Sequence, residues 1–133
     1  MGIIIDASIL VKIITKEPGW EKLEELLRGG ETLDLALVEV SNAIWKKTVL
    51  LGMMKYEDSI IALKAVKELL PQLLVVHKSV DFLQRAMEIS LKEKIPIYDS
   101  LYIALAEDKG EKLITGDKKQ YDVAIKYVKA EMW

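Results

Sequence analysis

The chain of 133 residues has no cysteine, a single histidine, three prolines and one phenylalanine. The absence of cysteine excludes disulfide bonds, thiolate zinc sites and cysteine nucleophiles, and makes the cytoplasm the expected compartment. No apolar run approaches the roughly 18 residues that a membrane-spanning helix requires. The first apolar residues lead directly into Asp6, without the pattern of a signal peptide. We therefore expect a cytoplasmic protein that has no membrane among its partners.

An excess of positive charge is also missing. The chain has 19 Lys and Arg residues against 21 Asp and Glu residues, which gives a net charge of −2. No overall basic field is therefore available to attract nucleic acid. This argues against a protein that binds nucleic acid through charge alone. It remains compatible with an enzyme that holds a phosphate group through bound cations.

Apolar residues are plentiful by contrast, at 51% of the chain. A chain of this length can bury a core of its own, and we find no linker, repeat or low-complexity tract. We expect residues 1–133 to form a single domain. The high apolar content also favours an exposed apolar surface that contacts another chain.

Short apolar runs alternate with longer amphipathic segments along the chain. The runs at 2–6, 73–77 and 112–115 predict strands, and 32–35 and 125–129 are possible further strands. Helices are expected at 8–15, 20–27, 37–51, 56–70, 79–94 and 98–108, with a short one after Asp117. The strand runs are continuously apolar, as expected when both faces of a sheet are covered. The pattern predicts an α/β fold: a three-layer sandwich with a short central parallel sheet flanked by helices.

Four carboxylates each interrupt an apolar run. They are Asp6 in GIIIDAS, Glu39 in LALVEVSNAIW, Asp99 in IPIYDSLYIALA and Asp117 in KLITGDKK. A carboxylate is rarely buried unless a hydrogen bond, a cation or a metal compensates its charge. If the fold gathers these four, their mutual repulsion calls for a hard divalent cation. Such a site suits a substrate that itself carries negative charge, most simply a phosphodiester.

The position of each acid allows a structural role as well. Asp6 and Asp117 directly follow predicted strands, and sites in parallel sheets form beyond the carboxyl ends of strands. Asp117 could equally cap the helix that it precedes, and Asp99 could cap or stabilise a helix N-terminus. Glu39 could lie on a solvated helix face. The four together are a more specific signal than any one of them.

The strings around these acids resemble the motifs of the PIN domain family, in particular the small toxin ribonucleases called VapC. The strings are IIIDASIL, LVEVSNAIWK, IPIYDSLYIALAE and KLITGDKKQYDVA, in this order along nearly the whole chain. Members of this family fold as a parallel α/β sandwich and cut RNA with Mg²⁺ or Mn²⁺ held by clustered acids. The resemblance also implies a homodimer and a small antitoxin protein that covers the site.

Carried over, the resemblance makes Asp6, Glu39, Asp99 and Asp117 the catalytic, metal-holding acids. Three further residues match supporting positions of the family's motifs: Ser8, Asn42 and Thr115. Ser8 could order Asp6 or a water, and Asn42 could support Glu39. Asp122 is a weaker candidate for an outer acid.

Lysines next to the acids are candidates for contacts with RNA phosphates. Lys118 and Lys119 merit the most interest because they directly follow Asp117, and Lys12 belongs to a wider set of candidates. Several other functions remain open at this stage: an RNA-processing or quality-control nuclease without an antitoxin, a metal-dependent DNA nuclease, and a catalytically silent interaction module. A phosphate-accepting receiver domain fits poorly, because the first strand ends with one Asp rather than an acidic pair.

Overall fold

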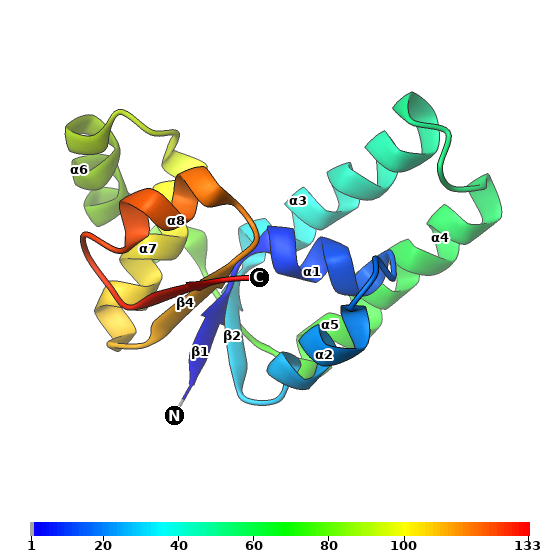
Figure 1. Ribbon diagram of the computed structural model, residues 1–133, viewed down its shortest axis with the longest axis horizontal. Helices are drawn as coiled ribbons and strands as arrows, with labels where there is room; N and C mark the ends of the chain where they lie inside the picture. The colour runs from blue at the N-terminus through cyan, green and yellow to red at the C-terminus, as the bar shows by residue number, and fades with distance from the viewer. Residues whose placement is uncertain (1) are drawn as a thin grey trace.

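Five parallel strands form a single sheet at the centre of the computed structural model, which describes residues 2–133 (Figure 1). The strands are β1 (Ile3–Ile5), β2 (Gly30–Leu33), β3 (Val75–His77), β4 (Lys112–Thr115) and β5 (Ala130–Met132), in the order β3-β2-β1-β4-β5. Apart from Lys112, the neighbouring strands β1 and β4 consist of Ile, Leu and Thr residues that are mostly buried. β-Branched residues suit a pleated surface that is covered on both sides.

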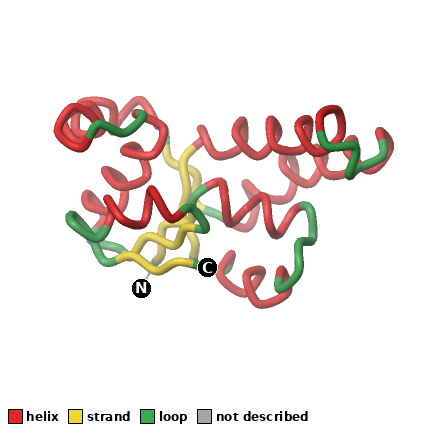
Figure 2. The backbone as a smooth tube through the Cα atoms, turned by 45° about the horizontal axis from the view of Figure 1, so that its top comes forward, coloured by secondary structure: helices red, strands yellow, loops and turns green. Residues whose placement is uncertain are grey.

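Helices cover both faces of this sheet, as Figures 1 and 2 show. On one side lie α1 (Ala7–Ile14), α2 (Trp20–Glu24), α3 (Asp34–Trp45), α4 (Tyr56–Lys64) and α5 (Leu70–Leu73). On the other side lie α6 (Leu83–Glu93), α7 (Ile97–Lys109) and α8 (Lys118–Ala124). Single turns of 3₁₀-helix occupy Glu25–Leu27 and Ser79–Phe82. The predicted three-layer parallel α/β fold is therefore confirmed.

The strand order creates a site-forming position between β1 and β4. The chain moves outward from β1 through β2 to β3, then returns to place β4 on the other side of β1. Ligands bind at this kind of switch point, outside the carboxyl ends of the strands. Ile5 lies opposite Ile114 in the pairing of β1 with β4. The residues that follow, Asp6 and Thr115, therefore emerge side by side at the carboxyl edge of the sheet.

A helical arm projects beyond the sheet on one side of the molecule (Figure 1). We use this name for α3, the π-helical turn Lys46–Leu50 that extends it, and α4, which continues through a second π-helical turn at Ala65–Leu69. Gly52, with a φ of +61°, reverses the chain between the two helices. Many large apolar side chains of the arm are exposed: Val38, Trp45, Val49, Leu50, Leu51, Met53, Tyr56, Ile60 and Ile61.

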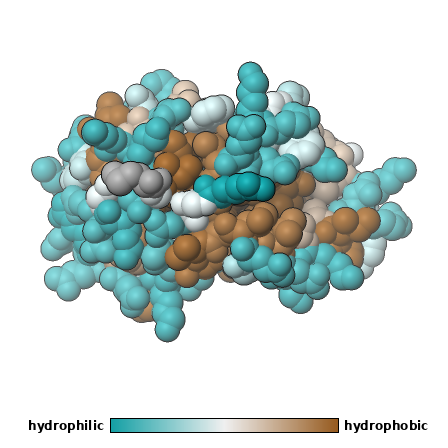
Figure 3. Space-filling view, turned by 90° about the horizontal axis from the view of Figure 1, so that it is seen from below, coloured by the Kyte–Doolittle hydropathy of each residue, from teal (hydrophilic) through white to brown (hydrophobic). Residues whose placement is uncertain are grey.

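Apolar side chains also gather on the face seen in Figure 3, in a broad zone that extends toward the side from which the arm projects. Scattered exposed apolar residues are normal, but contiguous groups of this kind mark contact surfaces. The apolar content of the sequence therefore fills a core and also leaves an apolar exterior.

A last strand does lie at the edge of the sheet, but the position predicted for it, 125–129, is wrong. The chain turns there, with main-chain hydrogen bonds from Tyr127 and Val128 back to Ala124, and the strand begins only at Ala130. Predicted boundaries also shift, most clearly before α3. The strand expected at 32–35 runs from Gly30 to Leu33, and the following helix begins at Asp34. Asp34 accepts hydrogen bonds from the main chain and hydroxyl of Ser79, which ties the start of α3 to another segment. Over residues 2–133, the longest apolar helical stretches are too short and too polar to cross a membrane.

Candidate functional site

Asp6 is the most deeply buried acid of the chain, with 2% of its surface exposed. It follows β1 and caps α1, where its Oδ1 accepts a hydrogen bond from the main chain of Ile9. Two hydroxyl groups hold the carboxylate from either side, Ser8 Oγ on Oδ1 at 2.5 Å and Thr115 Oγ1 on Oδ2 at 2.5 Å. Burial raises the pKa of Asp6 to about 6, against these hydrogen bonds, which lower it.

The turn after β4 is built around the same hydroxyl groups. The main chain of Gly116 donates to Ser8 Oγ at 2.7 Å, and the main chain of Asp117 donates to Thr115 Oγ1 at 3.0 Å. Asp117 then caps α8, accepting hydrogen bonds at Oδ1 from the main chains of Lys119 and Gln120. The segments that follow β1 and β4 are thus joined by a continuous hydrogen-bond network. Ser8 and Thr115 both donate to Asp6, and the supporting roles expected for them stay predictions.

Glu39 reaches the site from the middle of α3. Its Oε1 accepts a hydrogen bond of 2.6 Å from the hydroxyl of Tyr102 on α7. Partial burial raises the pKa of Glu39, and the nearby charges of Asp6 and Asp99 raise it further. Burial and the neighbouring Glu39 also raise the pKa of Tyr102 well above its usual value, so the phenol stays a neutral donor.

Asp99 lies in the first turn of α7, half-buried. Burial raises its pKa, the charge of Asp117 raises it further, and Lys119 lowers it. The side chain of Gln120, which is buried, donates to the main-chain oxygen of Asp99 at 3.0 Å and lies 3.4 Å from Thr115 Oγ1. Gln120 therefore connects the first turn of α7 to the end of β4.

The four predicted acids share one electrostatic environment. Asp117 influences Asp6 and Asp99, and Asp6 and Asp99 both influence Glu39. A nearby like charge raises the pKa of a carboxyl where water screens it poorly. Within residues 2–133, no three His, Cys, Asp or Glu side chains converge tightly enough to form a ready-made metal-ligand group. The acids thus lie at one edge of the sheet, but their carboxylates are not close enough together to surround one common position.

The donor set nevertheless suits a hard divalent cation. Asp99 accepts no side-chain hydrogen bond from residues 2–133, and Glu39 and Asp117 each accept theirs on one oxygen only. Mg²⁺ keeps several of its own waters and needs few direct carboxylate ligands. A wider spacing between carboxylates is compatible with that kind of coordination.

Three other predicted residues lie at the surface. Asn42 is exposed on α3, and the hydrogen bond to Glu39 comes from Tyr102. Lys118 forms an exposed ion pair with Asp122, with a nitrogen-to-oxygen distance of 3.1 Å. Lys119 is exposed but close enough to Asp99 to lower its pKa.

Sequence reasoning missed two residues of this site, Tyr102 and Gln120. Tyr102 follows Asp99 by three positions on α7, so the two share a helix face. Gln120 is a buried amide on a short helix among charged neighbours. The three-residue spacing between Asp99 and Tyr102 could have indicated that Tyr102 belongs to the site. Nothing in the local sequence distinguished Gln120 from an ordinary surface residue.

Comparisons with known proteins identify the family of this chain. The family model for the PIN domain matches residues 3–126. The chain is 32% identical over 122 residues to Ribonuclease VapC3 from Pyrobaculum aerophilum, an alignment that covers 90% of this chain and 92% of that protein.

Solved structures have the same fold. PAE2754 from Pyrobaculum aerophilum superposes with a TM-score of 0.71 and 24% identity, covering 98% of this chain and 92% of that one. VapBC2 from Rickettsia felis, solved bound to a DNA fragment from its promoter, gives a TM-score of 0.67 at 17% identity, with coverage of 100% and 99%. The sequence match over nearly the whole chain, together with the acid-lined carboxyl edge of the sheet, shows that this protein belongs to the PIN domain family.

Proposed function

We propose that this protein is a metal-dependent endoribonuclease that hydrolyses RNA phosphodiester bonds and acts as the toxin of a toxin–antitoxin pair. The observation that carries the proposal is the electrostatic coupling of Asp6, Glu39, Asp99 and Asp117 at the switch point of the sheet. The sequence similarity of this chain to a protein named as a ribonuclease supports RNA as the substrate.

Mg²⁺ or Mn²⁺ would be held by carboxylate oxygens of Asp6, Glu39, Asp99 and Asp117. When bound there, such an ion supplies charge neutralisation for the phosphate and a lowered pKa for water. The raised pKa values of Asp6, Glu39 and Asp99 fit this assignment. They arise because a buried carboxylate loses its hydration and is repelled by nearby carboxylates, and a bound cation would stabilise the charged form against both effects.

The protein's own residues fix the positions of these acids. Ser8 and Thr115 hold Asp6 through one oxygen each, and Tyr102 holds Glu39. Both arrangements use neutral hydroxyl donors, which orient a carboxylate while leaving its negative charge in place. Ordered acids can then position a cation and the water that attacks phosphorus without reorganising during the reaction. Hydrolysis of this kind leaves 5′-phosphate and 3′-hydroxyl ends.

The partner side of the proposal concerns a small antitoxin protein and a second copy of this chain. The exposed apolar side chains of the helical arm supply surface for such contacts. Several of the similar solved structures are toxin–antitoxin complexes, among them one from Klebsiella pneumoniae. We place the activity in the cytoplasm, where RNA is available to it.

A cleavage assay tests the enzymatic part. Single-stranded and structured RNA, and DNA of the same sequence, are incubated with the protein in Mg²⁺, in Mn²⁺ or in chelator, and the product ends are identified. We expect RNA cleavage that needs metal and leaves 5′-phosphates. Asp99→Asn, which preserves shape but removes the charge, should lower cleavage by about 100-fold or more. Asp108→Asn, on the exposed end of the same helix, should retain wild-type activity.

The outcomes separate the alternatives that the sequence left open. Preferential cleavage of DNA would indicate a DNA nuclease, and cleavage that survives both chelator and Asp99→Asn would reject the proposed site. Metal binding itself is measured by the change in melting temperature on adding Mn²⁺. We expect stabilisation of the wild type and of Asp108→Asn, and a much smaller effect in Asp99→Asn.

Expression in a bacterial host tests the toxin role. Production of the wild type should arrest growth, production of Asp99→Asn should not, and co-expression of the partner antitoxin should restore growth. Sedimentation of the purified protein measures whether it is a dimer. Efficient RNA cleavage without growth arrest would favour an RNA-processing enzyme over a toxin.

A further inference from the structure

We propose that Gln120 is a positioning residue of the acidic site: it holds the first turn of α7, and so keeps Asp99 where it can take part in binding the cation. This inference rests on the proposed function and deepens it. Gln120 lies on α8, and only 2% of its surface is exposed. A polar side chain is rarely buried this deeply unless its groups have partners in the protein. The partners of Gln120 therefore indicate its role.

Asp99 is the acid whose own carboxylate has the least support. Asp6, Glu39 and Asp117 each accept a hydrogen bond at a side-chain oxygen. The carboxylate of Asp99 accepts none from residues 2–133, so its position depends on the main chain that carries it. That main chain is the first turn of α7. Whatever holds this turn in place therefore also holds Asp99 in the site.

The helix itself gives this turn little support. α7 begins after Pro96, and no side chain caps its N-terminus. The main chains of Asp99 and Ser100 donate to the Pro96 oxygen at 3.2 and 3.4 Å, at and beyond the long end of the usual range. The first N–H groups of a helix lack the partners that the helix interior supplies. Contacts from other elements are therefore needed to hold the turn.

Gln120 supplies such a contact and joins it to the other acids. Its side-chain amide donates to the main-chain oxygen of Asp99 at 3.0 Å. Its main-chain N–H donates to Asp117 Oδ1 at 3.5 Å. Its side-chain oxygen lies 3.4 Å from Thr115 Oγ1, the hydroxyl that donates to Asp6. One residue thus contacts Asp99, Asp117 and the support of Asp6.

The orientation of the amide fits this role. A carbonyl oxygen only accepts, so the Asp99 oxygen faces the NH₂ group of Gln120, and the amide oxygen faces Thr115. The Thr115 hydroxyl has one proton, and its shorter contact, at 2.5 Å, directs that proton to Asp6. Gln120 therefore bonds to Asp99 without taking the donor that Asp6 uses. A carboxylate at position 120 could not donate to Asp99 and would add another negative charge to the site.

The experiment measures the affinity for Mn²⁺ in the absence of RNA, from the electron paramagnetic resonance signal of the free ion. Gln120→Met has a similar volume but removes the donor to Asp99, and Gln120→Asn keeps the amide on a side chain one methylene shorter. Ser90→Ala is the matched control. It removes the hydrogen bond of 2.7 Å from Ser90 to Ser100, the buried neighbour of Asp99 in the same turn. That contact ties the turn to α6 instead of to the acids.

We expect both Gln120 variants to weaken Mn²⁺ binding by about tenfold or more, as for loss of a residue that supports a metal ligand. Ser90→Ala should lower the melting temperature but bind Mn²⁺ like the wild type. In cleavage assays of Gln120→Met, the metal concentration that gives half the maximal rate should rise by the same factor, while KM for RNA stays unchanged. A variant that was only less well folded would instead lose activity at every metal concentration.

Other outcomes would overturn the inference or separate it from the proposed function. Wild-type affinity for Mn²⁺ in Gln120→Met would leave the proposed function standing and reduce Gln120 to a core residue. Equal losses of affinity in Gln120→Met and Ser90→Ala would reject a specific link to the acids, and failure of both Gln120 variants to fold would reject a role confined to the site.

The wild type itself separates the two proposals. If it neither binds Mn²⁺ nor cuts RNA, the proposed function fails, and the role of Gln120 fails with it. Mn²⁺ binding that weakens in Gln120→Met, although the wild type does not cut RNA, would support the positioning role and count only against catalysis.

Discussion

Thr115 Oγ1 donates a hydrogen bond of 2.5 Å to Asp6 Oδ2 across the pairing of β1 with β4. Both residues are buried, so neither group has water as an alternative partner. Thr115→Val keeps the shape of the side chain and removes the donor. We expect the free energy of unfolding to fall by about 1–3 kcal/mol at pH 8, as for loss of a buried hydrogen bond to a charged group. Urea unfolding measures this, and Thr115→Ser, which keeps the hydroxyl, should lose less.

The stability of the metal-free protein should depend on the protonation of Asp6. Burial raises the pKa of Asp6 to about 6, from an ordinary value near 3.8. Between these values the folded protein binds a proton that the unfolded chain releases, so this contribution is fully present below pH 3.8 and is lost as the pH rises through about 6. Over that window the contribution declines by about 3 kcal/mol at most.

Asp6→Asn isolates this effect, because the other acids titrate in both proteins. The free energy of unfolding of the wild type minus that of Asp6→Asn, measured in metal-free buffer, should fall from pH 4 to pH 7.5. A difference that is flat or rises with pH would mean that Asp6 is not a buried acid with a raised pKa.

Tyr102 should control the charge state of Glu39. Its hydroxyl donates to Glu39 Oε1, and this hydrogen bond lowers the glutamate pKa against the burial that raises it. Tyr102→Phe should therefore raise the pKa of Glu39 further, and move the acidic limb of the pH–activity profile upward. We expect activity near neutral pH to fall by about tenfold, as for loss of an outer support of a metal ligand. An unchanged profile would show that Glu39 is positioned without Tyr102.

Much of this architecture could be predicted from sequence, because strand runs such as Ile3–Ile5 and Lys112–Thr115 are short, continuously apolar and followed by an acid. The weaker signal at 125–129 was misleading. Ile125, Tyr127 and Val128 suit a strand by residue type, yet main-chain hydrogen bonds to Ala124 hold this segment as a turn.

The residues of the site also differ in how well the sequence could place them. Asp6 and Asp117 could be placed because strand ends locate them. The partners Tyr102 and Gln120 meet the acids only through tertiary contacts between segments far apart in the chain. Asn42 illustrates the limit, since sharing a helix face with Glu39 does not ensure a contact. The roles of all these residues in activity stay predictions until the variants are measured.

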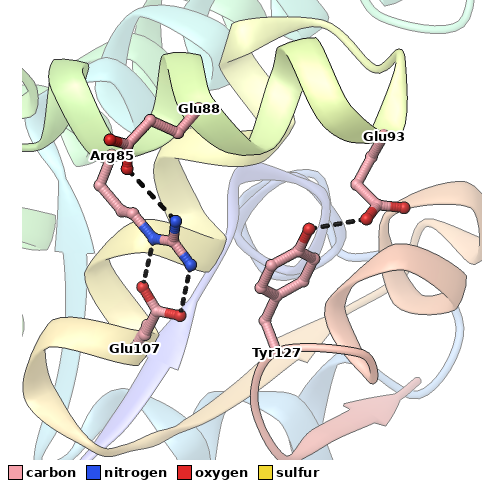
Figure 4. Close-up of polar contacts among 5 residues, drawn as sticks. All are labelled: Arg85, Glu88, Glu93, Glu107 and Tyr127. Carbon is pink, nitrogen blue, oxygen red and sulfur yellow. Dashed lines mark hydrogen bonds and ion pairs between the residues drawn. The ribbon is translucent and has the colours of Figure 1, made fainter.

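A group of polar contacts holds the connection that leads from α8 into β5 (Figure 4). Arg85 on α6 binds Glu107 on α7 through two hydrogen bonds, of 2.6 and 3.0 Å, and its guanidinium carbon lies 5.7 Å from the centre of the Tyr127 ring. The Tyr127 hydroxyl donates to Glu93 at the end of α6, at 2.6 Å. Because Tyr127 lies three residues before β5, these contacts hold the chain where that strand begins.

Tyr127→Leu should therefore loosen β5 without disturbing the central strands. It removes both the ring beneath Arg85 and the hydrogen bond to Glu93, so opening of the strand should cost less free energy. We expect faster hydrogen exchange at the Trp133 amide, which bonds to Thr115 in the folded protein, and unchanged exchange in β1. Tyr56→Leu, at an exposed position on α4, is the matched control. Equal exchange at Trp133 in the two variants would mean that β5 is held by its pairing with β4 alone.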